Sequence, residues 1–89
     1  MTLPFPLSSV LKVLAYKRDE LTTDLICFDV TTDAAGGART WLFHEEQPGF
    51  EEIARELALL PGFLTDWRDH VVKPAFASCE IVLYSRPIS

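Results

Sequence analysis

The sequence predicts an α+β fold: a mainly antiparallel sheet of three or four strands with one main helix and one short helix, in the order β-β-β-α-α-β. Two observations support this fold class. Runs rich in β-branched and aromatic residues precede a stretch with helical apolar spacing, and one more such run follows it. Clusters of glycine and proline separate these runs where a hairpin turn and the ends of a helix are expected.

The beginning of the chain is expected to be extended and then to form a strand. Residues 3–6 carry two prolines, and proline disfavours helical backbone in the residue before it. Residues 8–18 fit two patterns, and their β-branched and aromatic content favours a strand over the alternative, a helix. Helical spacing is shown by Val10, Val13, Leu14 and Lys17, and strand alternation by Leu11, Val13 and Ala15.

A β-hairpin is predicted next. The segment Asp24–Thr31 contains the apolar, β-prone run 25–28 and is flanked by threonines. Residues 33–37, Asp-Ala-Ala-Gly-Gly, have the polar and glycine chemistry of a hairpin loop. The segment Ala38–His44 then returns as a strand that carries Trp41.

The main helix is predicted over residues 48–60. Pro48 suits a first helical turn, where its missing N–H removes no helical hydrogen bond. Glu51 and Glu52 lie near the positive end of the helix dipole, and Pro61-Gly62 ends the helix. One continuous apolar face is formed by Phe50, Ile53, Ala54, Leu57 and Leu60.

A short second helix and a last strand complete the predicted order. Thr65 or Asp66 can cap this helix, and Pro74 ends it. The segment Cys79–Arg86 reads as a strand because it contains a β-branched and aromatic run.

Length and charge exclude several classes of protein. A chain of 89 residues is expected to form one domain over 1–89. With 13 acidic against 8 basic residues and a net charge of -5, it is a poor candidate for nucleic-acid binding, which depends on Lys and Arg contacts to phosphate. None of its apolar runs approaches the ~20 residues that span a bilayer, so no membrane contact is expected.

The cysteines favour a cytoplasmic location. Cys27 and Cys79 lie in separate apolar segments without CxxC spacing, which is usual for reduced thiols in the cytoplasm. A single Cys27–Cys79 disulfide is the alternative, because the sequence does not show geometry.

The densest group of candidate metal ligands begins at His44. Imidazole and carboxylate groups can bind zinc or manganese, but an acidic loop before a helix explains the same residues through the helix dipole. Because the chain lacks a second histidine at metal-site spacing, we expect neither a metal nor a cofactor. The group consists of His44, Glu45, Glu46, Glu51 and Glu52.

The sequence also contains residues that could form nucleophile–base pairs. Cys27 can pair with His44 or His70, and Ser78 with His70 and Asp69, but no family-specific signature surrounds either cysteine. The four glycines form no phosphate-binding motif. The sequence therefore favours a protein that is not an enzyme.

The strands carry apolar residues on both faces, which predicts self-association. One helix covers one face of a small sheet, so the other face would expose an apolar patch. We expect a homodimer through a sheet face or edge, unless the sheet curls into a partial barrel that buries both faces. The expected interface residues are Trp41, Phe43, Val82 and Tyr84, whose roles can exchange with Leu42, Ile81 and Leu83 if the other parity is exposed.

The alternative function is binding of a small molecule, or a minor enzymatic activity. It places a pocket between helix 48–60 and the sheet, near Trp41, His44 and Trp67.

Three stretches of the sequence resemble segments of known kinds of protein: residues 16–25, residues 43–50, and Leu60-Pro61-Gly62-Phe63. Together they resemble small bacterial proteins of the conserved-hypothetical kind. The strand meander that leads into a helix is also similar to bacterial pleckstrin-homology-like domains, which have more strands and end in a helix. Neither resemblance implies functional residues in this chain.

Overall fold

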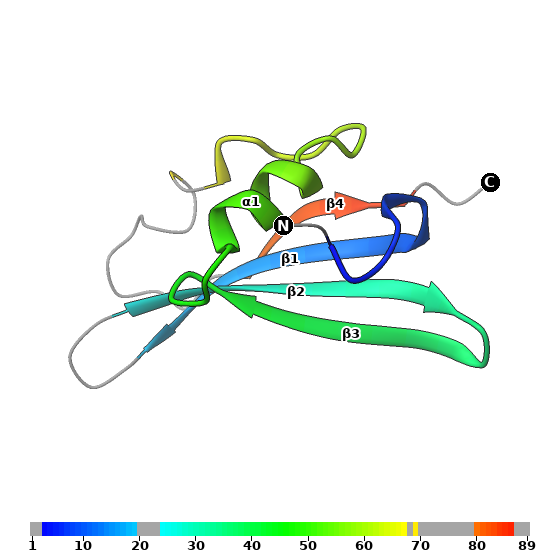
Figure 1. Cartoon of the computed structure of the whole chain (residues 1–89). Coiled ribbons are helices and arrows are strands. Elements are labelled where there is room, and N and C mark those ends of the chain that lie inside the picture. Colours follow the sequence, from blue (N-terminus) through cyan, green and yellow to red (C-terminus); the bar gives the residue numbers. More distant parts are fainter. Residues whose placement is uncertain (1–2, 20–23, 68, 70–79, 87–89) are drawn as a thin grey trace.

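The computed structural model describes residues 3–19, 24–67, 69 and 80–86 (Figure 1). After a short 3-10 turn, three strands are followed by a helix and a fourth strand. The elements are η1 (Leu7–Ser9), β1 (Val10–Asp19), β2 (Asp24–Ala34), β3 (Gly37–His44), α1 (Phe50–Leu57) and β4 (Ile81–Ser85).

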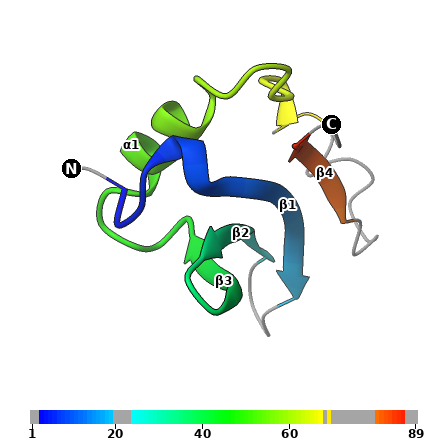
Figure 2. The same cartoon turned by 90° about the vertical axis from the view of Figure 1, so that its right-hand side faces the viewer.

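The four strands form one sheet in the order β3-β2-β1-β4, and every neighbouring pair is antiparallel. Strands β1 to β3 form a meander, and the chain then crosses one face through α1 before β4 joins the sheet beside β1 (Figures 1 and 2). The α+β class and the antiparallel sheet agree with the sequence analysis.

The predicted order β-β-β-α-α-β is not matched. The described residues contain one complete α-helix and one 3-10 turn, and Trp67 and Asp69 also have helical backbone. The 3-10 turn follows Pro6, whose φ of -73° is ordinary for proline. The second predicted helix, from Thr65 or Asp66 to Pro74, falls largely outside the described residues.

Residues 10–19 form strand β1, and a bulge explains why their pattern also fitted a helix. Val10 pairs with Thr32 and Lys12 with Thr31, so Leu11 is an extra residue in the ladder with β2. The bulge resets the alternation, and the three-residue step from Val10 to Val13 joins two side chains that are both buried. Figure 2 shows that β1 also bends strongly along its length.

The predicted hairpin is present as β2 and β3. Ala34 pairs with Gly37, which leaves a two-residue turn. Gly36 has a φ of 96°, a backbone conformation that side-chain-bearing residues rarely adopt, so a glycine is needed here.

Helix α1 is shorter than the predicted helix over 48–60. Gly49 has a φ of 85°, outside the helical region, so the helix begins only at Phe50. After Leu57 the chain continues in turns, with hydrogen bonds such as Leu60 N–H to Leu57 O at 3.0 Å. The predicted apolar face is confirmed, because Phe50, Ile53, Ala54, Leu57 and Leu60 are all buried.

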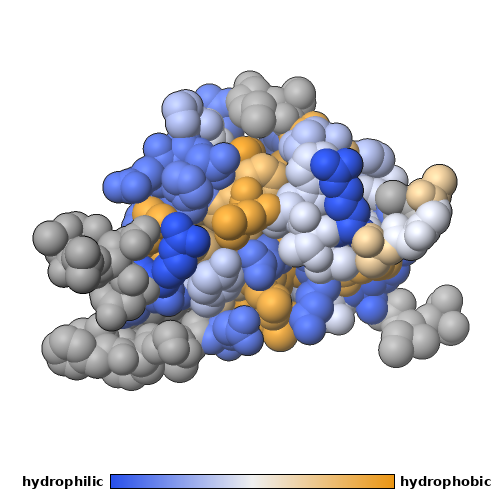
Figure 3. All heavy atoms as spheres, turned by 90° about the horizontal axis from the view of Figure 1, so that it is seen from below, coloured by the Kyte–Doolittle hydropathy of each residue, from blue (hydrophilic) through white to orange (hydrophobic). Residues whose placement is uncertain are grey.

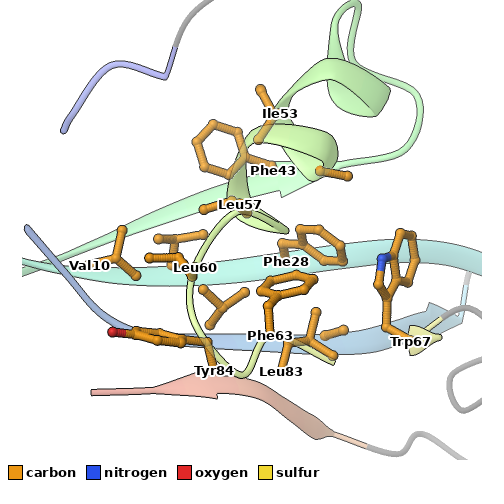
Figure 4. Close-up of a cluster of buried hydrophobic side chains, with 14 of the residues drawn as sticks. Val10, Phe28, Phe43, Ile53, Leu57, Leu60, Phe63, Trp67, Leu83 and Tyr84 are labelled. Carbon is orange, nitrogen blue, oxygen red and sulfur yellow. The ribbon is translucent and has the colours of Figure 1, made fainter. Parts of the chain in front are cut away.

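The core lies between α1 and the covered face of the sheet (Figure 4). Phe28 is fully buried at its centre, with its ring centroid 5.0 Å from that of Phe50 and 4.8 Å from that of Trp67. Phe63 and Trp67, from the segment after α1, pack into the same cluster. Within the described residues, no helix has the length and apolar character needed to cross a membrane.

Candidate functional site

The sheet face opposite α1 carries a row of side chains that crosses all four strands. The register aligns Val82, Leu14, Asp29 and Leu42 across β4, β1, β2 and β3. Leu42 is 47% exposed and Val82 is 50% exposed, so both ends of the row lie in solvent. Figure 3 shows this face from below, with apolar surface in its middle and polar residues around it. We call this surface the open face.

The next row on the open face contains Tyr16, Cys27 and His44. The Tyr16 hydroxyl donates a hydrogen bond to Oδ1 of Asp29 at 3.2 Å. Burial, followed by the charge of Asp29, raises the pKa of Tyr16 to about 12, so the phenol is neutral at physiological pH. This row therefore presents a polar, hydrogen-bonded centre rather than an ionised nucleophile.

The geometry does not favour catalysis by Cys27. Its Cα pairs with that of His44 across β2 and β3, as the candidate nucleophile–base pair requires. However, Cys27 is fully buried, and its thiol donates to the carbonyl of Leu25 at 3.7 Å. His70 and Ser78, the other candidates, lie outside the described residues.

The carboxylates after β3 do not converge on a metal site. Glu45 turns back to β2, where its Oε1 accepts a hydrogen bond from the N–H of Ile26 at 3.1 Å. In the part of the chain that is described, no three His, Cys, Asp or Glu side chains form a group that could hold a metal.

The four predicted interface residues lie in different places. Phe43 and Tyr84 are only 6% and 9% exposed, and Trp41 is half-buried against Phe5, with ring centroids 5.3 Å apart. Of these four, Val82 alone is exposed on the open face. Leu42 is exposed there too, and the sequence analysis named it as a residue that could take over the interface role. The expectation for Phe43 and Tyr84 is thereby corrected.

Two features explain that correction. Trp41 and Phe43 share the strand parity that α1 covers, since they pair with the buried residues Val30 and Phe28. On β4, Val13 pairs with Tyr84 but Leu14 pairs with Val82, so Leu83 is an extra residue. This bulge directs both Leu83 and Tyr84 into the core.

The three predicted pocket residues are not brought together. Trp41 lies on the covered face, and His44 lies on the open face. Trp67 packs edge-on against Phe28 and Phe50, so its ring fills the space between α1 and the sheet.

The two edges of the sheet differ, and this difference identifies the candidate site. At the β4 edge, the N–H of Leu64 donates to the carbonyl oxygen of Leu83 at 2.9 Å. Where β2 extends beyond β3, Glu45 closes the edge, because its N–H donates to Ile26 O at 3.0 Å and its side chain accepts from Ile26 N–H. Strand β3 forms the remaining edge.

The hydrogen-bond ladder shows which groups of β3 point outward. Since Glu45 bonds to Ile26, alternation places Phe43, Trp41 and Arg39 in hydrogen-bonded pairs with β2. The residues between them direct their backbone N–H and C=O groups away from the sheet. They are Ala38, Thr40, Leu42 and His44.

Gln47 occupies the outward groups of His44. The N–H of His44 donates to Oε1 of Gln47 at 2.8 Å, and the N–H of Gln47 donates to His44 O at 3.0 Å. Ala38, Thr40 and Leu42 have no such partner in the described parts of the chain. All three side chains are exposed, and we call these three residues the free edge.

A preorganised side-chain pair adjoins the free edge on the covered side of the sheet. The guanidinium carbon of Arg39 lies 4.0 Å from the ring centroid of Trp41. The indole N–H donates to the hydroxyl of Thr32 at 3.1 Å, which fixes the orientation of the ring. A cation and an aromatic ring are therefore held beside the outward backbone groups.

Sequence reasoning did not identify the free edge or the residues that close the other edges. Leu64 bonds to β4, which becomes its neighbour only when the sheet order is known, whereas Gln47 bonds to His44 and Glu45 bonds to Ile26 close to the β2–β3 hairpin. A polar residue just after a strand is the one local signal that suggests such closure. No protein family, curated protein sequence or solved structure gives a significant match to this chain.

Proposed function

We propose that this chain is a non-enzymatic protein-interaction module that forms a homodimer by pairing its β3 edge with that of a second copy. The observation that carries the proposal is the free edge, where Ala38, Thr40 and Leu42 present backbone groups to solvent. Unpaired strand edges are templates for another strand, and proteins usually protect them. Here Leu64 bonds to one outward carbonyl of β4 and Glu45 bonds to the overhang of β2, whereas three residues of β3 have outward groups without a partner in the described parts of the chain.

A second copy of the chain suits this edge. Two identical strands that pair antiparallel are related by a two-fold axis, so each free edge supplies donors to the acceptors of the other. The side chains of the free edge are Ala38, Thr40 and Leu42, so no like charges meet on that face of the new pair. Leu42, half-exposed in the single chain, would gain a neighbour.

The size of the contact predicts a reversible dimer. A strand of eight residues is roughly 27 Å long, and pairing of two such strands buries less than the ~1,200 Å² of a standard interface. The dimer fraction should therefore rise with protein concentration.

Two further points concern the cellular location and the alternative function. Cys27 is fully buried in the sheet, and the spacing of the two cysteines in the sequence supports the proposal of a reducing, cytoplasmic location. The alternative function, a small-molecule pocket between α1 and the sheet, gains no support where Phe28, Phe50 and Trp67 pack against one another.

Light scattering after size exclusion tests the proposal, with loading from about 5 to about 500 µM. The mass should rise from 10.0 kDa toward twice that value. Thr40→Pro should stay monomeric, because proline removes one outward N–H without touching the ladder between β2 and β3. Thr40→Val keeps that N–H and is the matched control.

A third variant distinguishes a dimer formed through the β3 edge from a dimer formed through the open face. Val82→Lys places a charge on the open face at the opposite side of the sheet from β3. An edge dimer tolerates this change, and a face-to-face dimer does not. A mass of 10.0 kDa at every concentration, or dimers of Thr40→Pro equal to those of the unchanged chain, would contradict the proposal.

A further inference from the structure

The free edge limits the ways in which two copies can pair. This inference rests on the proposed homodimer and concerns its register. In an antiparallel pair, outward residues must face outward residues, so Ala38, Thr40 and Leu42 of one chain meet the same set of the other. One register uses all three: Thr40 lies opposite Thr40 of the partner subunit, and Ala38 lies opposite Leu42 of the partner subunit.

We infer that Arg39 selects this register by lying against Trp41 of the partner subunit. With Thr40 at the two-fold axis, Arg39 is directly opposite the partner's Trp41, and Trp41 is opposite the partner's Arg39. These positions form non-hydrogen-bonded pairs, in which the Cα atoms are about 4.5 Å apart and side chains are closest.

The single chain already holds the two groups in place for this contact. The guanidinium lies 4.0 Å from the centroid of its own Trp41 ring, on the covered side of the sheet. The bond from Trp41 Nε1 to Thr32 and the packing of Phe5 hold the ring. In the dimer each guanidinium lies beside two indole rings, and little side-chain freedom is lost on binding.

The neighbouring registers lose these contacts. A shift by two residues in one direction places Arg39 opposite the partner's Arg39, so like charges meet in the closest type of pair. A shift in the other direction places Ala38 opposite the partner's His44, whose outward groups are already bonded to Gln47. Each shifted register keeps fewer backbone hydrogen bonds than the register centred on Thr40.

Crosslinking of variants with a single introduced cysteine shows which residues of the two β3 strands face each other. In a Cys79→Ser background, which leaves only the buried Cys27 thiol, Thr40→Cys should form a disulfide-linked dimer under mild oxidation. Its two Cα atoms would be about 5.5 Å apart, within the range that a disulfide spans. Ala38→Cys and Leu42→Cys are the controls, because their symmetry mates would lie more than about 13 Å apart.

The crosslinking results distinguish failure of the register from failure of the dimer. Crosslinking of Thr40→Cys alone supports the inference. Stronger crosslinking of Ala38→Cys or Leu42→Cys overturns the register and leaves the edge dimer standing. If none of the three crosslinks while light scattering shows a dimer, mixtures of Thr40→Cys with Ala38→Cys or with Leu42→Cys decide the outcome. Crosslinking in a mixture shows a register shifted by two residues, which overturns the inference and leaves the edge dimer standing. No crosslinking in either mixture places the interface elsewhere, and the proposed function fails as well.

A second experiment tests the role of Arg39 itself. Arg39→Ala should raise the dimer Kd by about threefold to tenfold, and mixtures of Thr40→Cys with Ala38→Cys or Leu42→Cys should begin to crosslink as the shifted registers become populated. Arg39→Lys keeps the cation and should restore part of both effects. A purely structural role would alter the free energy of unfolding but not the distribution of crosslinks. An unchanged distribution in Arg39→Ala would overturn the assignment of Arg39.

Discussion

The backbone N–H of Leu64 bonds to the carbonyl oxygen of Leu83 at 2.9 Å, and this contact occupies an outward group of β4. Leu64 belongs to the segment that follows α1. The described residues just after the helix therefore protect part of the β4 edge in addition to packing into the core.

Proline at position 64 should open this second edge. Leu64→Pro removes the donor, so we expect a loss of about 1–3 kcal/mol of unfolding free energy from the unpaired carbonyl of Leu83. We also expect species larger than a dimer, because a chain with two open edges can grow at both ends. Urea unfolding and light scattering measure the two effects.

Leu64→Ala is the control for that experiment, because it removes side-chain packing but retains the N–H. It should lower stability without producing larger species. If Leu64→Pro gave the same mass as the unchanged chain, the segment would have no role in closing the edge.

Truncation of Leu57 tests the packing of α1. Leu57 is fully buried beneath the helix, so Leu57→Ala should cost about 2–5 kcal/mol through lost transfer energy and a cavity. Leu59 lies just after α1 and is 74% exposed, so Leu59→Ala should change stability by less than about 0.5 kcal/mol. Denaturant titration of both variants checks the prediction, and equal losses would contradict the orientation of α1.

The phenol of Tyr16 should lose its proton at a higher pH than an ordinary tyrosine. In a Tyr84→Phe background, the phenolate absorbance of the folded chain reports on Tyr16 alone, and we expect its pKa near 12 rather than 10.0. Asp29→Asn should lower this pKa only in part, because burial is the larger cause and remains. A Tyr16 that titrates near 10.0 in the folded chain would contradict the burial of its hydroxyl.

The same pKa shift has a consequence for stability. Between pH 10 and pH 12, an unfolded Tyr16 has lost its proton while the folded one retains it. The folded state then binds more protons, so the free energy of unfolding should fall as the pH rises through this interval. Tyr16→Phe should lack this component when both chains are unfolded with urea at a series of pH values.

Gln47 should limit the length of the free edge. Gln47→Ala frees the N–H of His44, which becomes a fourth outward donor. We expect tighter dimerisation together with a second register, in which His44 faces the partner's Ala38 and Thr40 faces the partner's Leu42. That register is visible as crosslinking in a mixture of Thr40→Cys and Leu42→Cys. Gln47→Glu keeps an acceptor oxygen at the same place and should behave like the unchanged chain. Identical crosslinking of the unchanged chain, Gln47→Ala and Gln47→Glu would contradict the role of Gln47 in limiting the free edge.

The parts of the fold that local signals determine were predictable from the sequence. Glycine at the turn identified the β2–β3 hairpin, and three- and four-residue spacing identified the buried face of α1. The end of the helix was placed too late, because apolar spacing continues through Leu60 after the helical hydrogen bonds stop.

Bulges and sheet order account for what the sequence did not predict. The extra residue Leu11 gave β1 a helix-like spacing, and the extra residue Leu83 turned Tyr84 inward. Which strands lie at the edges depends on β4 joining β1 from far along the chain. The candidate site therefore could not be located by any pattern within β3 alone.

The bulge at Leu11 also constrains how this segment can vary in evolution. Because Val10 and Lys12 already face successive residues of β2, removal of Leu11 would leave Val10 opposite Thr32 and would turn the bulge into a regular ladder. Phe5 would keep the side of the sheet on which it packs against Trp41 and Phe43. Related chains should accordingly tolerate loss of a single residue at this position, whereas loss of one residue elsewhere in β1 would transfer the side chains before it to the opposite face.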